Sequence, residues 1–113
     1  LEKKKASGAT ISILSNTAFI ESKTLRKVLI ILGMDKYIDF QLYSDELGVS
    51  KPNRIAFTNM LGYVDRYRIH NPISISEITH IGDNLKADVK GAFKAGIDGF
   101  LINTQNISIL NVE

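Results

Sequence analysis

The chain has 113 residues, 44% hydrophobic and 23% charged, which suits one globular domain with an ordinary core. The net charge is +2 and the basic residues are scattered apart from Lys3–Lys5, a run typical of a solvated tail, so no nucleic-acid surface is indicated. Without cysteine, disulfides and thiolate metal sites are excluded, and no apolar stretch resembles a signal peptide or a membrane span. We expect a cytoplasmic protein.

Short apolar segments and helical patterns alternate along the chain. The predicted strands are, in order, Ala9–Ser15, Phe40–Ser44, Ile78–Gly82 and Gly99–Asn103. The first predicted helix carries an apolar stripe at helical spacing: Leu25, Val28, Leu29 and Leu32. The second begins near Pro52 and carries Ala56, Met60, Tyr63, Val64 and Tyr67. The third carries Leu85, Val89, Ala92 and Phe93. This alternation predicts an α/β fold with a parallel sheet.

Polar residues follow three of the predicted strands, where functional groups gather in parallel sheets. Ser15 and Asn16 follow the first strand, Lys51 lies in the loop after the second, and Asp83 follows the third. A hydroxyl and backbone amides can hold phosphate oxygens, a lysine neutralises their charge, and carboxylates bind Mg²⁺. Asp88, one turn later, could reach toward the metal or toward Lys51. These residue types predict a phosphoryl site.

Each of these residues also has a simpler interpretation. Ser15 could be a turn or cap residue, and Lys51 could be an exposed lysine in solvent. Asp83 and Asn84 could cap the third helix, and Asp88 could be a surface residue near the start of that helix. Their joint placement at successive strand ends favours a functional site. Neither GxGxxG nor GxxxxGK[ST] occurs, which disfavours dinucleotide-binding and P-loop domains.

Three segments resemble motifs of the haloacid dehalogenase-like (HAD) hydrolase superfamily. ILSNT (Ile13–Thr17), GVSKPNRIAF (Gly48–Phe57) and HIGDNLKADVKGAFKAG (His80–Gly96) resemble its second, third and fourth motifs. The resemblance runs from about Ile11 to Asn103. It implies a three-layer, Rossmann-like core. Most members are Mg²⁺-dependent phosphatases, so it also implies Mg²⁺ and a small phosphorylated metabolite as ligands.

The resemblance implies a role for each strand-end residue. Ser15 would hydrogen-bond a phosphoryl oxygen, and Asn16 would help to position it. Lys51 would stabilise charge on the phosphate and on the attacking carboxylate. Asp83 would bind Mg²⁺, and Asp88 would either support the metal's surroundings or hold Lys51. A metal-independent haloacid dehalogenase is an alternative, although such members resemble a Ser-Asn pattern where this chain has acidic Asp83.

The family's nucleophile motif, Asp-x-Asp followed by x-Thr or x-Val, does not occur in this chain. In the family it ends a strand ahead of the stretch that resembles Ile11, and only ten residues precede Ile11 here. We therefore expect residues 1–113 to be the carboxyl-terminal portion of one HAD-like core domain, without the first strand, the cap and the nucleophile. The expected partner is the missing amino-terminal part of the same protein. Alone, the chain should be inactive. Alternatively, it is an inactive module that binds phosphate or a partner.

The missing strand is the central one of the family's sheet. The strands that end at Ser15 and Gly82 would then lack their shared neighbour. We expect the chain by itself to be marginally stable, or to close the gap by pairing these two strands. His80 is a strand histidine, which is most simply a satisfied core or edge residue, and we assign it no chemistry.

Overall fold

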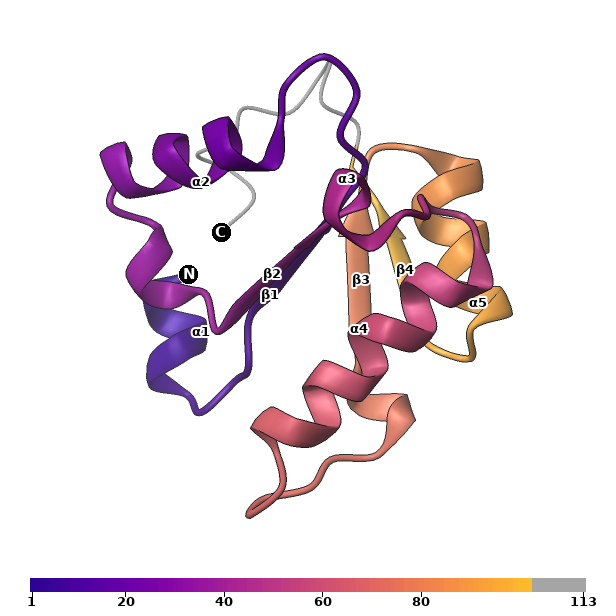
Figure 1. Cartoon of the computed structure of the whole chain (residues 1–113). Coiled ribbons are helices and arrows are strands. Elements are labelled where there is room, and N and C mark those ends of the chain that lie inside the picture. The colour runs from indigo at the N-terminus through magenta and orange to yellow at the C-terminus, as the bar shows by residue number, and fades with distance from the viewer. Residues whose placement is uncertain (103–113) are drawn as a thin grey trace.

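The computed structural model describes residues 1–102 as alternating helices and strands (Figure 1). The strands are β1 (Ser12–Ser15), β2 (Phe40–Tyr43), β3 (Thr79–Gly82) and β4 (Asp98–Leu101). The α-helices are α1 (Glu2–Ala6), α2 (Ser22–Ile31), α3 (Ser44–Leu47), α4 (Arg54–Tyr67) and α5 (Gly91–Lys94). Short 3₁₀ turns are η1 (Asp35–Tyr37) and η2 (Ile75–Glu77), and η3 (Leu85–Lys90) is π-helical. No helix among these residues is long and apolar enough to cross a membrane.

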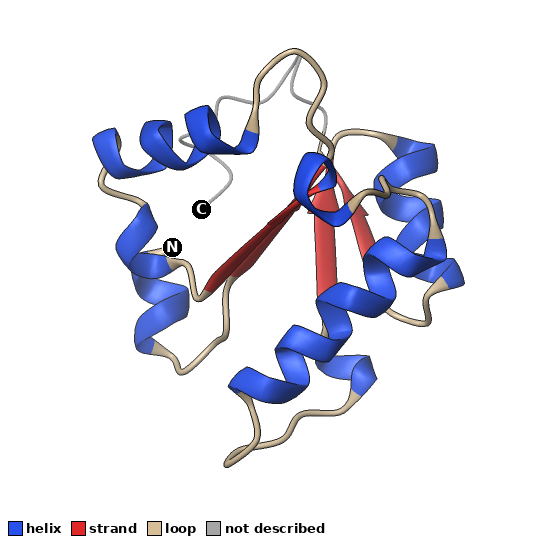
Figure 2. Ribbon diagram, in the orientation of Figure 1, coloured by secondary structure: helices blue, strands red, loops and turns tan. Residues whose placement is uncertain are grey.

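The strands form two separate parallel pairs (Figure 2). β1 pairs with β2, with Leu14 opposite Leu42, and β3 pairs with β4, with Ile81 opposite Phe100. The predicted parallel α/β arrangement is therefore confirmed. Of the two alternatives expected for the isolated chain, the pairing of the strands that end at Ser15 and Gly82 is wrong, because β1 and β3 lie in different sheets. Marginal stability stays a prediction.

Helix α4 connects the two sheets through one core. Its buried face carries Ala56, Phe57, Met60 and Val64. This face packs with Leu14, Phe40 and Leu42 of β1 and β2, and with Ala92 and Ile97 around α5. Burying one such side chain contributes about 1.5–3 kcal/mol, so α4 holds the two halves together without a continuous sheet. The predicted stripe of α4 is confirmed except at its end, where Tyr67 is exposed.

Two predicted helices pack less well than their patterns suggest. In α2, Val28 and Leu32 of the expected buried stripe are exposed, and Figure 1 shows α2 apart from α4. The third predicted helix is divided into η3 and α5, which buries Val89 and Ala92 but leaves Leu85 and Phe93 exposed. A helical stripe needs a surface to pack against, and the two-stranded sheets offer a small one.

The strands are also shorter than predicted. β1 begins at Ser12 rather than Ala9, because the side chain of Asp39 accepts the backbone N–H of Ile11 at 2.8 Å beside the start of the ladder. Ser44 begins α3 instead of ending β2. β4 ends at Leu101, and the predicted end at Asn103 lies outside the described residues.

Candidate functional site

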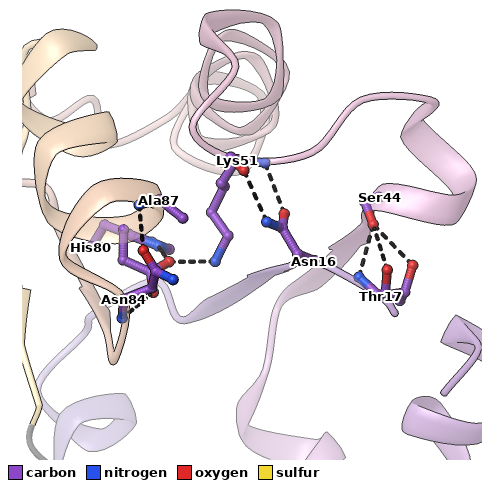
Figure 3. A network of polar contacts seen from close by, with 8 residues as sticks. Asn16, Thr17, Ser44, Lys51, His80, Asn84 and Ala87 are labelled. Carbon is purple, nitrogen blue, oxygen red and sulfur yellow. Dashed lines mark hydrogen bonds and ion pairs between the residues drawn. The ribbon is translucent and has the colours of Figure 1, made fainter. Parts of the chain in front are cut away.

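The segments that follow β1 and β3 meet at Lys51, which lies between α3 and α4 (Figure 3). The side-chain amide of Asn16 binds the backbone of Lys51 twice. Asn16 Oδ1 accepts the N–H of Lys51 at 2.8 Å, and Asn16 Nδ2 donates to the C=O of Lys51 at 2.9 Å. The paired donor and acceptor fix the loop before α4 against the end of β1, so the side chain of Lys51 starts from a defined point.

That side chain makes a buried ion pair with Asp88. Lys51 Nζ lies 2.5 Å from Asp88 Oδ1, and the two side chains are only 9% and 5% exposed. Burying two charges is costly unless they are paired and their other hydrogen-bonding positions are filled. This contact corresponds to one of the two roles expected for Asp88, that of holding Lys51.

The remaining positions on Asp88 are filled by its neighbours. Nε2 of His80 lies 3.0 Å from Asp88 Oδ1, and the backbone N–H of Asn84 donates to Oδ2 at 3.1 Å. Burial raises the pKa of Asp88, but the hydrogen bonds from Lys51, His80 and Asn84 outweigh it and lower the pKa overall. Asp88 is therefore a carboxylate at neutral pH.

His80 belongs to this cluster, a contact that the sequence did not reveal. Its side chain is 12% exposed and its ring meets the Phe57 ring edge-on, with centroids 5.4 Å apart. Burial lowers the pKa of His80, the hydrogen bond to Asp88 opposes this, and the charge of Lys51 lowers the pKa further. The neutral imidazole then donates Nε2–H to Asp88. Side chains alternate along a strand, so His80 and Gly82 lie on the same face of β3. The sequence does not show that Asp88 packs against that face, and without this fact the alternation does not reveal the contact.

Gly82 makes room for the Asp88 carboxyl group. A Cβ atom built on Gly82 would lie 2.1 Å from Cγ of Asp88, far inside van der Waals contact. Asp88 reaches this place because η3 is π-helical: the N–H of Asp88 and the N–H of Val89 both donate to the carbonyl of Asn84, at 2.9 and 3.4 Å. The Asn84 side chain also accepts the N–H of Ala87 at 2.8 Å and so caps this turn.

Ser15 and Asp83 occupy the expected strand ends. Ser15 is the last residue of β1 and is half-buried, and Asp83 follows β3 directly and is exposed. Within residues 1–102, no group of three or more His, Asp, Glu or Cys side chains could hold a metal ion. Mg²⁺ is usually held by one or two carboxylates together with phosphate oxygens and water. Asp83 fits one such carboxylate, whereas Asp88 is already occupied by Lys51 and His80.

A second polar cluster, which the sequence did not indicate, joins the ends of β1 and β2. Ser44 Oγ accepts the N–H of Thr17 at 2.8 Å (Figure 3). The Thr17 hydroxyl accepts the N–H of Asp45 at 3.1 Å. Beside it lies an open hollow of about 510 Å³, lined by Asn16, Thr17, Ala18, Ser44, Asp45, Gly48, Val49 and Ser50. Asn16, which holds the backbone of Lys51, is the residue that this hollow shares with the lysine site, and its volume suits a small metabolite.

The parallel pairs of strands, covered by helices and carrying polar residues at their carboxyl ends, define the class as a Rossmann-type α/β protein. Its family follows from comparison with known proteins: the HAD-hydrolase-like family model matches residues 48–108, and the chain belongs to this family. The resemblance of its motifs to the HAD superfamily is thereby confirmed.

Individual relatives agree with this assignment. The chain is 33% identical over 104 residues to a ribulose-1,5-bisphosphate 5-phosphatase of Halopiger xanaduensis, and covers 39% of that protein. The putative HAD-hydrolase YfnB of Bacillus subtilis, solved bound to magnesium, is 27% identical with a TM-score of 0.67; the match covers 88% of this chain and 40% of that one.

Two further solved structures share the fold. An uncharacterized protein of Listeria monocytogenes serotype 4b is 26% identical with a TM-score of 0.72, over 95% of this chain and 62% of that one. A HAD phosphatase of Thermococcus onnurineus is 24% identical with a TM-score of 0.71, over 97% of this chain and 46% of that one. The chain thus spans less than two thirds of the length of each of these proteins.

Proposed function

We propose that this chain forms part of a Mg²⁺-dependent phosphatase that hydrolyses phosphoric monoesters through an aspartyl-phosphate. The observation that carries the proposal is the position of Lys51, whose ammonium group is held by Asp88 at the strand edge where Ser15 and Asp83 also lie. A cation fixed in a buried place can stabilise phosphate charge without reorganising during the reaction. The family membership of the chain supports the same chemistry.

The residues of this chain would bind and orient the phosphoryl group. Ser15 would donate its hydroxyl to a phosphoryl oxygen, Asn16 would fix the loop that carries Lys51, and Lys51 would neutralise charge. Asp88 would keep Lys51 in place. Asp83 would be one ligand of Mg²⁺, which when bound offsets the negative charge of the phosphate. The nucleophilic aspartate and the general acid would come from outside this chain, so residues 1–113 alone would bind phosphate but not hydrolyse its esters.

The substrate would be a small phosphorylated metabolite. The hollow of about 510 Å³ beside Asn16 can accept a compound of that size. An inactive module that binds phosphate or a partner is the second candidate, since no Asp-x-Asp motif occurs in the sequence. The acidic Asp83 disfavours the third candidate, a metal-independent dehalogenase.

The test is a titration of the chain with inorganic phosphate, with and without Mg²⁺, followed by amide chemical shifts. Shifts at Ser15, Asn16 and Lys51 are expected, and Mg²⁺ should tighten binding. Asp83→Asn should remove the effect of Mg²⁺, whereas Asp98→Asn, an exposed carboxylate at the start of β4, should keep it.

An assay with an aryl phosphate completes the test. No turnover by the chain alone is expected. Mg²⁺-dependent turnover that Asp83→Asn abolishes would place the nucleophile within this chain and overturn that part of the proposal. Absence of both phosphate and Mg²⁺ binding would overturn the phosphatase assignment and favour a partner-binding module.

A further inference from the structure

The imidazole of His80 is a buried polar group that the proposed phosphatase chemistry leaves unused. It belongs to the middle of β3, two residues before the strand ends at Gly82, which is about 6–7 Å along the strand. Nε2 of His80 contacts Oδ1 of Asp88, the same oxygen atom that contacts Nζ of Lys51 (Figure 3). The oxygen that holds the lysine therefore has a second partner, which comes from inside the sheet.

The carboxylate of Asp88 offers Lys51 a restricted choice of positions. Each carboxylate oxygen has two lone pairs and so two acceptor positions. On Oδ1, His80 Nε2 fills one at 3.0 Å and Lys51 Nζ fills the other at 2.5 Å. The second oxygen, Oδ2, accepts the backbone N–H of Asn84 at 3.1 Å, which keeps the carboxyl group from turning. With His80 in place, one position on Oδ1 is left for the ammonium group.

The position that His80 fills is the inner one. Lys51 reaches Asp88 from the loop before α4, beside the carboxyl end of β1 (Figure 3). His80 reaches it from the middle of β3 and lines a cavity of about 650 Å³ between the two sheets, which neither Lys51 nor Asp88 lines. An ammonium group at the inner position would point toward this cavity, away from the strand ends.

The direction of the ammonium group decides what else Lys51 can bind. A lysine ammonium group has three N–H bonds. Within residues 1–102, Asp88 is the one group that accepts from Nζ of Lys51. Two N–H bonds are therefore left for other acceptors. From the outer position on Oδ1 they can serve an acceptor at the carboxyl ends of β1 and β3, where Ser15 and Asp83 lie.

We propose that His80 is a positioning residue for Lys51: by donating Nε2–H to the inner position on Asp88 Oδ1, it keeps the lysine ammonium group at the outer one. The edge-on contact with Phe57 holds the imidazole ring in this orientation. A phosphate would then meet N–H bonds that already point toward it, so binding needs little reorganisation. This consequence for phosphate rests on the proposed function, whereas the placement of Lys51 does not.

The placement of Lys51 is measured first, by NMR on the 113-residue chain without phosphate or Mg²⁺. Couplings between the ring protons and ring nitrogens should show the Nε2–H tautomer of His80 at neutral pH. His80→Leu keeps an apolar side chain there but removes the donor. In this variant the Hε protons of Lys51 should gain nuclear Overhauser effects to Leu14 and Met60, which line the cavity. His80→Gln, whose amide can donate from a similar place, should keep the parent pattern.

Phosphate affinity is measured second, by titration of the same variants with inorganic phosphate. His80→Leu should bind phosphate about three- to tenfold more weakly than the parent, as expected for one hydrogen bond, and His80→Gln within about twofold. The control is His70→Leu, which replaces an exposed histidine after α4 and should bind as the parent does. A parent chain that binds no phosphate would reject the proposed function, and the first measurement would still decide the placement of Lys51.

Several results would overturn the inference. An Nδ1–H tautomer of His80 would mean that Nε2 does not donate to Asp88. Parent-like Overhauser effects in His80→Leu would mean that Lys51 keeps its place without His80. Equal changes in His80→Leu and His80→Gln would mean that the shape of the ring matters and its donor does not. If His80→Leu fails to fold, the parent chain decides: the Nε2–H proton should exchange slowly and lie close to the Hε protons of Lys51, and failure of either rejects the role.

Discussion

Asp88 Oδ1 accepts from two side chains at once, Lys51 Nζ at 2.5 Å and His80 Nε2 at 3.0 Å. One oxygen atom thereby ties the loop before α4 to the middle of β3. Lys51 is bound to the end of β1 through Asn16, so the cluster spans both sheets. In a molecule whose sheets do not touch edge to edge, this polar link supplements the core around α4.

Removing the Asp88 charge should destabilise the fold strongly. Asp88→Asn leaves the buried Lys51 ammonium without a counter-charge, and breaking a buried pair in this way costs about 3–5 kcal/mol. The free energy of unfolding in urea measures the loss. The control is Asp83→Asn, which removes the charge of an exposed carboxylate and should change the free energy of unfolding by less than about 0.5 kcal/mol. Equal effects of the two substitutions would contradict the burial of the pair.

Acid should destabilise the chain in two stages. The lowered pKa of His80 means that the folded state resists its protonation, so stability falls as the pH drops below 6.5, the ordinary value. The pKa of Asp88 is lower in the folded state than its ordinary value of 3.8. The stability that this carboxylate contributes is therefore complete at pH values above 3.8 and is lost as the pH falls toward the pKa of the folded state. Urea unfolding at pH 7.5, 6 and 5 should show the first stage in the parent chain. His80→Gln should show a flatter profile over that range, and an equally steep one would refute the assignment.

Gly82→Ala should be destabilising by about 1–3 kcal/mol, because its Cβ would lie 2.1 Å from Cγ of Asp88 and one of them must move. Thermal unfolding measures the effect. The control is Gly62→Ala in α4, where nothing lies within 4 Å of the added Cβ. There alanine should stabilise by about 0.5–1 kcal/mol, since glycine is the poorer helix former. A Gly82→Ala protein as stable as its parent would show that Asp88 does not occupy this place.

Asn16→Ala should loosen Lys51 without removing its charge. The substitution deletes two hydrogen bonds to the Lys51 backbone, each contributing about 0.5–1.5 kcal/mol, with the lower end expected at this exposed position. The Lys51 amide should exchange faster, while the amide of Asn84, which donates to Asp88, should stay protected. Faster exchange at both sites would indicate global unfolding instead of local release.

The sequence by itself determined the order of the four strands and of helices α2, α4 and α5. It also placed Ser15 and Asp83 at strand ends and Lys51 in the loop before α4. These are local properties. The spacing of apolar residues indicates whether a segment forms a helix or a strand, and residues that directly follow a strand in the sequence lie at its end. The apolar face of α4 was predictable for the same reason.

Only the tertiary structure decided which surface each helix face and each strand packs against. The stripe of α2 has the right period, but nothing within residues 1–102 covers Val28 and Leu32. Periodicity alone cannot tell whether a surface is available for a helix to pack against. The contact of Asp88 with His80 depends on the π-helical turn of η3 and on the open space at Gly82, and neither is encoded in spacing alone. The division into two sheets is likewise a matter of long-range pairing. Among the strands of residues 1–102, β1 and β3 each have one partner, and distant segments pack around α4 in that arrangement.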